Sequence, residues 1–149
     1  RMKKISIVLI LAIVLSLLCS CGQKGGYETP EEAATLFVKS VIENDPEAFS
    51  QCVHPNMLSD WASSFHVDGE DHDNEVTDVH VGGVGSVAVE DLEDIQDDLG
   101  GDYNITITDE VVVTVYAKFY EYGHSEEKSH SFDCYVMKVG GRWYAWGWS

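Results

Sequence analysis

The first 20 residues constrain the fold most, because their sequence pattern is typical of a segment that is cleaved off and takes no part in the folded protein. Three basic residues among the first four positions precede an uncharged run from Ile5 to Leu18. This run is shorter than the roughly 20 apolar residues of a membrane-spanning helix. A basic start, a short apolar run and small residues at its end are typical of a secretory signal peptide. We therefore expect residues 1–20 to be cleaved, which leaves a chain about the length of one ordinary domain.

The end of this segment indicates a lipid anchor. The sequence Leu18-Cys19-Ser20-Cys21 places a small residue directly before a cysteine, and it resembles the lipobox of bacterial lipoproteins. In that family the signal is cut before the cysteine, and the cysteine sulfur and the new amino group are acylated. The resemblance implies lipid attachment at Cys21 and a location on the extracytoplasmic face of the cell membrane. A plain secretory signal or an uncleaved anchor is the alternative.

The charge of the chain restricts its partners. The sequence has 26 acidic and 9 basic residues and a formal net charge of −17, and the signal peptide carries three of the basic residues. A negative field of this strength repels phosphate backbones, so we exclude nucleic acid as a partner. It also disfavours a basic patch that binds anionic lipids. We therefore expect the acyl chains on Cys21 to be the contact with the membrane.

Two cysteines remain after Cys21, namely Cys52 and Cys134. An extracytoplasmic location permits a disulfide between them, and the alternative is two separate buried thiols that behave as small apolar residues. Strand alternation places Cys134 with Phe132 and Val136 on a face that turns toward the helices. We expect both sulfurs to be buried, whether or not they are bonded.

The start of the mature chain predicts a tether and three helices. Residues 21–28 contain glycines and predict a flexible tether, followed by a single domain over 29–149. Thr29-Pro30-Glu31-Glu32 predicts a helix start, with the threonine as cap and the proline in the first turn. Asn44-Asp45-Pro46 ends this helix and starts a short second one. The four-residue spacing of Met57, Trp61 and Phe65 predicts a third helix.

The rest of the domain predicts strands and one more helix. Residues 76–89 are rich in valine and broken by glycines, which predicts a strand with a bulge or a hairpin. Residues 90–99 carry one apolar stripe, and Gly100-Gly101 is expected to end this helix. Alternating residues predict long strands over 111–122 and 128–139, and Gly140-Gly141 predicts a tight turn into a last strand. Helices first and antiparallel strands last make an α+β domain.

Two stretches carry a resemblance to a known superfamily. They are the pattern from Thr29 to Asp45 (TPEEAAxxFVxSVxxND) and the closing hairpin from Gly140 to Tyr144 (GGRWY). Together they resemble the nuclear-transport-factor-like domain, which includes ketosteroid isomerase, and the small lipoproteins of that superfamily in particular. The resemblance implies a cone-shaped fold, in which a curved antiparallel sheet wraps around the helices with a pocket between them. Members include enzymes, transport factors and subunit-assembly domains, so the fold does not settle the function.

An enzyme of this fold needs a carboxylate or histidine in an apolar pocket and a partner that stabilises an oxyanion. Suitable residue types are present, but none matches a catalytic position of the family. We therefore assign no catalytic and no cofactor-binding residue. The candidates by residue type alone are Asp60, His66, His80, Asp133, Tyr116 and Tyr135.

The acidic run from Asp68 to Asp78 raises the question of calcium binding. A calcium loop that starts at Asp71 has oxygen ligands at its first, third and fifth positions. Val76 and Gly82 then stand where the EF-hand pattern requires glycine and glutamate, so the pattern fails. The histidines lack the spacing of a structural zinc site. We expect a solvated loop and no metal or cofactor, with weak calcium binding by clustered carboxylates as the alternative.

Four large aromatic residues crowd the C-terminus. Alternate members are expected to fill the core of the last strand while the others cover its outer face, and an aromatic ligand surface is the alternative. The residues are Trp143, Tyr144, Trp146 and Trp148.

Taken with the anchor, these features predict a lipid-anchored module that binds a small apolar ligand or a protein partner without catalysis. A pocket enzyme of isomerase or dehydratase type and a domain that forms homodimers through its sheet are the alternatives. A deep apolar cavity with a buried carboxylate would favour the enzyme. A sheet interior filled with side chains would favour the interaction module.

Overall fold

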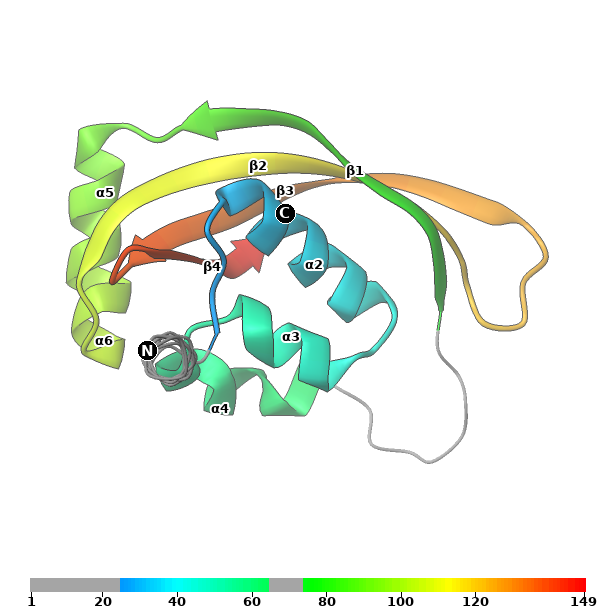
Figure 1. Cartoon of the computed structure of the whole chain (residues 1–149), viewed down its shortest axis with the longest axis horizontal. Coiled ribbons are helices and arrows are strands. Elements are labelled where there is room, and N and C mark those ends of the chain that lie inside the picture. The colour runs from blue at the N-terminus through cyan, green and yellow to red at the C-terminus, as the bar shows by residue number, and fades with distance from the viewer. Residues whose placement is uncertain (1–24, 65–73) are drawn as a thin grey trace, which may run out of the picture.

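The computed structural model describes residues 25–64 and 74–149, and it shows an α+β arrangement with the helices first (Figure 1). The signal peptide, most of the tether, Phe65 and His66 lie outside the described residues. The leading helices are α2 (Pro30–Ile42), α3 (Pro46–Cys52) and α4 (Leu58–Trp61), with single 3-10 turns at Pro55–Met57 and Ala62–Ser64. The expected order of three helices is confirmed.

Four antiparallel strands form one sheet in the order of the sequence. They are β1 (Glu75–Ser86), β2 (Ile107–Tyr120), β3 (Glu127–Val139) and β4 (Arg142–Trp148). The glycine-broken first strand is a single strand with two register shifts against β2 rather than a hairpin. Gly140 and Gly141 both have positive φ, 58° and 77°, and join β3 to β4, as a two-residue hairpin turn of this type requires.

The helix starts follow from local capping. Thr29 Oγ1 accepts a hydrogen bond from the Glu32 backbone N–H at 3.3 Å, and Asp45 Oδ1 accepts one from the Ala48 N–H at 3.0 Å. Each cap is followed by a proline, which has no N–H to leave unsatisfied in the first turn. These bonds fix where α2 and α3 begin.

The sheet curves over α2, and their contact forms the main core (Figure 1). Phe37 of α2 is fully buried, and its ring centroid lies 5.8 Å from that of Trp148 on β4. The predicted inner face of the strands is confirmed, because the alternate residues of β2 and β3 that turn toward α2 are buried. These buried residues are Val113, Val115, Ala117, Phe119, Cys134 and Val136.

The helix between β1 and β2 is longer than the sequence predicted. It runs as α5 (Val89–Ile95), a π-helical turn (Gln96–Gly100) and α6 (Gly101–Tyr103). Both glycines keep helical dihedral angles, so the expected stop at Gly100-Gly101 is wrong. Asn104 ends the helix instead, because it adopts the left-handed conformation with a φ of 54°, as the residue after a helix commonly does.

Gly100 has a packing role that explains its position inside the helix. The Gln96 side chain passes over it, donates to the Ile105 carbonyl at 3.2 Å and accepts from the Ile107 N–H at 2.6 Å. A Cβ at position 100 would lie 2.1 Å from Gln96 Nε2 and 2.9 Å from the Ile105 carbonyl oxygen. A Cβ at Gly101 would meet nothing within 4 Å.

This difference between adjacent glycines gives a paired prediction. Gly101→Ala should raise the free energy of unfolding by about 0.5–1 kcal/mol, because alanine favours a helix over glycine at no steric cost. Gly100→Ala should lower it by about 1–3 kcal/mol, because the new methyl group displaces Gln96 from two hydrogen bonds. Chemical denaturation of the purified variants measures both, and equal effects of the two substitutions would contradict the description of this turn.

Candidate functional site

An apolar groove between α3 and α4 is the candidate functional site. Its volume is about 200 Å³, and we call it the α3–α4 groove. Carbon-rich side chains form most of its wall, with one hydroxyl. Its lining residues are Pro46, Phe49, Ser50, Leu58, Trp61 and Ala62.

The floor of the groove is fixed by aromatic contacts with the core. The Trp61 ring lies 5.5 Å from that of Phe49 and 6.0 Å from that of Phe37, the latter edge to face. Phe37 and Phe49 are themselves 5.4 Å apart. Edge-to-face and tilted pairs at these distances are attractive beyond the area they bury, so the walls are held in place by the same residues that hold α2 on the sheet.

Buried side chains lie between α2 and the sheet. Phe37, Val38 and Ala34 of α2 are fully buried there, as are Val113 and Val136 on the facing strands. Another hollow, of about 370 Å³, lies on the surface beside α5. It has a mixed lining of apolar, amide and acidic side chains: Leu92, Glu93, Gln96, Asp97 and Ile107.

Glu110 is a buried acid that sequence reasoning did not single out. It is 3% exposed, on the face of β2 opposite to Val111 and Val113, and its Oε2 has no hydrogen-bond partner among the described residues. Burial, with a smaller contribution from the nearby Asp91 carboxylate on α5, raises the pKa of Glu110 to about 7. The Trp146 indole beside the carboxyl lowers the pKa, although its Nε1–H does not reach hydrogen-bond geometry.

The candidate catalytic residues named by type do not converge on one site. Asp60 on α4 accepts a hydrogen bond from the Tyr103 hydroxyl, at the end of α6. His80 pairs with the exposed Asp78 at 2.9 Å and lies 5.5 Å from the Tyr116 ring, on the outer face of the sheet. His66 lies outside the described residues. Among the candidates that the structure describes, His80 and Tyr116 lie side by side on the exposed outer face of the sheet.

The other two candidates also have structural partners. Asp133 accepts a hydrogen bond from the Thr114 hydroxyl at 2.8 Å across the sheet. The Tyr135 ring packs 5.3 Å from Trp146. Neither residue lines the α3–α4 groove.

Most of the acidic run lies outside the described residues, which resume at Asn74. Asn74 Oδ1 accepts a hydrogen bond from the Tyr122 N–H at 3.0 Å. In the parts of the chain that the structure describes, no group of three or more His, Cys, Asp or Glu side chains is placed to hold a metal ion.

The two cysteines of the domain are both fully buried, as expected, with Cys134 on the inner face of β3 that strand alternation predicted, and the structure has both as free thiols. Burial is the main cause that raises the pKa of each thiol to about 12. Cys52 also raises the pKa of Cys134, so the two sulfurs lie within electrostatic range of one another. A thiol with a pKa this high carries almost no thiolate at neutral pH and is a poor nucleophile.

The C-terminal aromatic residues serve the core and both faces of the sheet. Trp143 and Tyr144 are buried, and Trp148 stacks on Phe132 at 4.9 Å on the inner face. Trp146 is half-buried beside Tyr135. The expected simple alternation is not followed, because Trp143 and Tyr144 are both buried and the pairing of β4 with β3 shifts register between Tyr135 and Val136.

Comparison with known proteins gives no relative. No protein family, no curated protein and no solved structure matches the chain at a significant level. Among the helices of the described residues, none has the length and apolar composition needed to cross a membrane.

The buried Glu110 carboxyl predicts a pH-dependent stability. Its pKa of about 7 in the folded state lies above the value of about 4.3 for an unfolded glutamate. Between these values the folded chain binds more protons, so the free energy of unfolding should fall as pH rises from about 4 through 7. We expect Glu110 to account for about 1–3 kcal/mol of this fall.

Denaturation of the wild type and of Glu110→Gln at a series of pH values measures this effect. The variant should lose the part of the pH dependence that Glu110 causes, and it should gain stability relative to the wild type as pH rises. Glu93→Gln, which changes an exposed acid on α5, is the control. Parallel curves for the wild type and Glu110→Gln would show that the carboxyl is solvated.

Proposed function

We propose that this protein is a lipid-anchored, extracytoplasmic interaction module without catalysis. The α3–α4 groove carries the proposal, because it is an apolar, preformed hollow at the surface and such hollows are typical of sites for apolar groups. The anchor at Cys21 holds the module at the membrane. The apolar group that enters the groove belongs to a small ligand or to a binding partner.

The placement of the buried acid supports a non-catalytic role. A pocket enzyme requires its carboxylate to face the substrate, but Glu110 lies under α5 and outside the lining of the α3–α4 groove. Asp60, which adjoins the lining residue Trp61 in the sequence, is exposed and accepts a hydrogen bond from Tyr103. Among the described residues that line the groove, none is an acid or a histidine, so this lining supplies no general base.

The architecture supports placing the domain in the nuclear-transport-factor-like superfamily as part of the same proposal. Helices precede a curved antiparallel sheet that wraps over α2 (Figure 1), which is the plan that the resemblance of Thr29–Asp45 and Gly140–Tyr144 implies. The outer face of the sheet is largely polar, with Asp78, His80 and Lys118 exposed. A polar face of this kind favours solvent over a second copy of the sheet.

The anchor is tested by Cys21→Ser in the organism's own membrane or in a bacterial host that processes lipoproteins. The wild type should float with membranes and incorporate radiolabelled fatty acid. The variant should lose the label and appear in soluble or unprocessed forms, because the acylated sulfur is absent. A processed Cys21→Ser protein that still floats with membranes would contradict lipid attachment at this residue.

The groove is tested with the neutral apolar dye N-phenyl-1-naphthylamine, because an anionic probe would be repelled by the acidic surface. The lipid-free protein that begins at Gly22 should enhance the dye's fluorescence. Ala62→Asp should weaken binding by roughly tenfold, about 1.4 kcal/mol, because it places a charge in the apolar wall. Ser63→Asp adds the same charge at the adjacent exposed position outside the lining, and it should bind as the wild type does. Equal binding by both variants would exclude the groove as the site.

A further inference from the structure

We infer that the α3–α4 groove faces the membrane and that the apolar group it takes is the interfacial region of the lipid bilayer. This inference rests on the proposed lipid anchor at Cys21 and names the partner of the same groove. It depends on where the chain leaves the domain, how far the tether reaches, and what lies beside the point of exit.

The chain leaves the domain at a fixed point. The Gly26 N–H donates to the Gln51 carbonyl of α3 at 2.8 Å, and Tyr27 exchanges two backbone hydrogen bonds with Trp143 at 3.0 and 2.9 Å. The Arg142 guanidinium donates to the Gly26 carbonyl at 2.6 Å. The end of the expected tether is thus bound to α3 and β4, and only the residues before Gly25 are left to span the distance to the lipid.

The remaining tether is shorter than the domain. Four peptide steps separate Cys21 from Gly25, so they reach at most about 14 Å when fully extended. A compact domain of this length is roughly 35 Å across. The acylated end therefore cannot reach the far side of the domain, and the surface around Gly25 must lie close to the headgroups.

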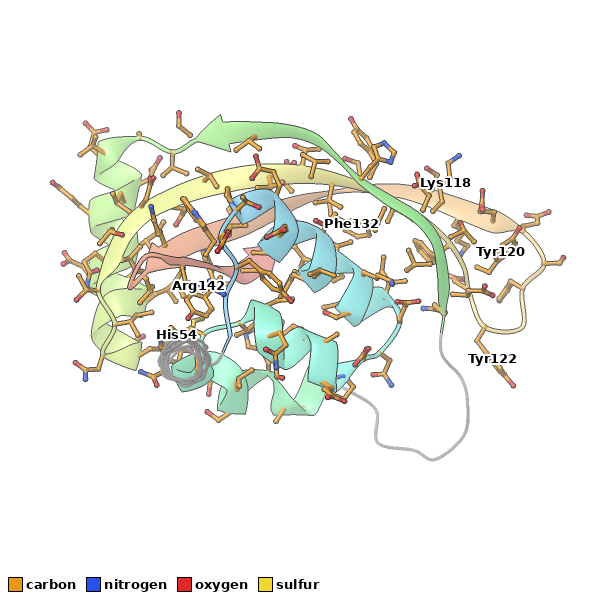
Figure 2. The ribbon with its side chains drawn as sticks, in the orientation of Figure 1. His54, Lys118, Tyr120, Tyr122, Phe132 and Arg142 are labelled. Atoms are coloured by element: carbon orange, nitrogen blue, oxygen red, sulfur yellow. The ribbon has the colours of Figure 1, made fainter. Side chains whose placement is uncertain are left out.

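The α3–α4 groove is part of that surface. Ser50 lines the groove, and its carbonyl oxygen lies 3.7 Å from the Cβ position of Gly25. Figure 2 shows His54 and Arg142 on this side of the molecule, whereas Lys118, Tyr120 and Tyr122 lie toward the opposite end, on the β2–β3 hairpin. The hairpin end therefore points away from the anchor.

The chemistry of the groove suits the interface between headgroups and acyl chains. Leu58 and Trp61 are half-buried, and both line the groove. An indole beside aliphatic side chains is typical of the surfaces that enter this interface, since the ring is apolar and its N–H stays near water. The groove therefore offers an apolar surface, beside the point where the chain leaves the domain, that can take an acyl segment.

Acidic residues near the groove weaken its own binding to membranes, so a stable contact with the bilayer needs the anchor. Asp45 and Glu47 flank Pro46, and Asp60 adjoins Trp61 in the sequence; all three are exposed. Their charge opposes anionic lipids, so the groove by itself should bind vesicles weakly. Attachment through Cys21 makes the contact intramolecular and raises the effective concentration of lipid at the groove.

The test measures the depth of single spin labels on the lipidated protein in phosphatidylcholine vesicles. Ala62→Cys places a label at the groove, and Ser131→Cys places one on the outer face of the sheet; both parent residues are exposed. Cys52 and Cys134 are fully buried and the Cys21 sulfur is acylated, so the wild type is the control for background labelling. Accessibility to oxygen and to a water-soluble nickel complex reports the depth of each label.

The expected result is a several-fold higher ratio of oxygen to nickel accessibility at position 62 than at position 131. Water-like ratios at both positions on a protein that floats with the vesicles would overturn the inference, and would leave a small ligand or a protein as the occupant of the groove. A protein that receives no lipid and does not float would overturn the proposed anchor as well. Flotation and depth are measured on the same sample, so the two failures are distinguishable.

Discussion

The contacts of Phe37 determine how the rest of the helical layer is placed. Its ring meets Trp148 of the sheet on one side and Phe49 and Trp61 of the following helices on the other, all within 6.0 Å between centroids. One fully buried side chain on α2 therefore sets the position of α3 and α4 relative to β4. The α3–α4 groove exists because Phe49 and Trp61 pack on this ring, with Phe49 buried beneath the half-buried Trp61 and Leu58. A smaller residue at position 37 would remove the floor of the groove together with part of the core.

Local signals in the sequence were sufficient to predict most of the elements. Thr29, Asp45 and the prolines after them mark helix starts through hydrogen bonds that involve neighbouring residues only. The strand faces followed from alternation, because a residue's side of a strand depends on its position alone. Gly140-Gly141 predicted its turn because two successive residues of positive φ are needed there.

The features that failed, or were missed, depend on contacts between distant segments. Gly101 is a common helix end by type, but here it continues the helix, because Gln96 and Asn104 fix where the chain turns back toward β2. In the sequence, Glu110 is one more acid before a valine-rich strand. Its burial depends on its packing near α5 and Trp146, which the sequence pattern does not reveal. The α3–α4 groove requires the meeting of two short helices around Phe37. No periodicity within either helix could have predicted that meeting, although the spacing of Met57, Trp61 and Phe65 predicted the third helix.

The two edges of the sheet are protected from pairing with another chain in different ways. Tyr27 forms an isolated antiparallel bridge with Trp143, so the chain itself covers the start of the β4 edge. The other edge, β1, has two register shifts and three glycines within its strand, and such bulges twist an edge away from pairing with another chain. The segment that covers β4 also determines where the tether leaves the domain, beside α3. The pairing that protects the sheet edge thus fixes the side of the domain that an anchor at Cys21 would draw toward the membrane.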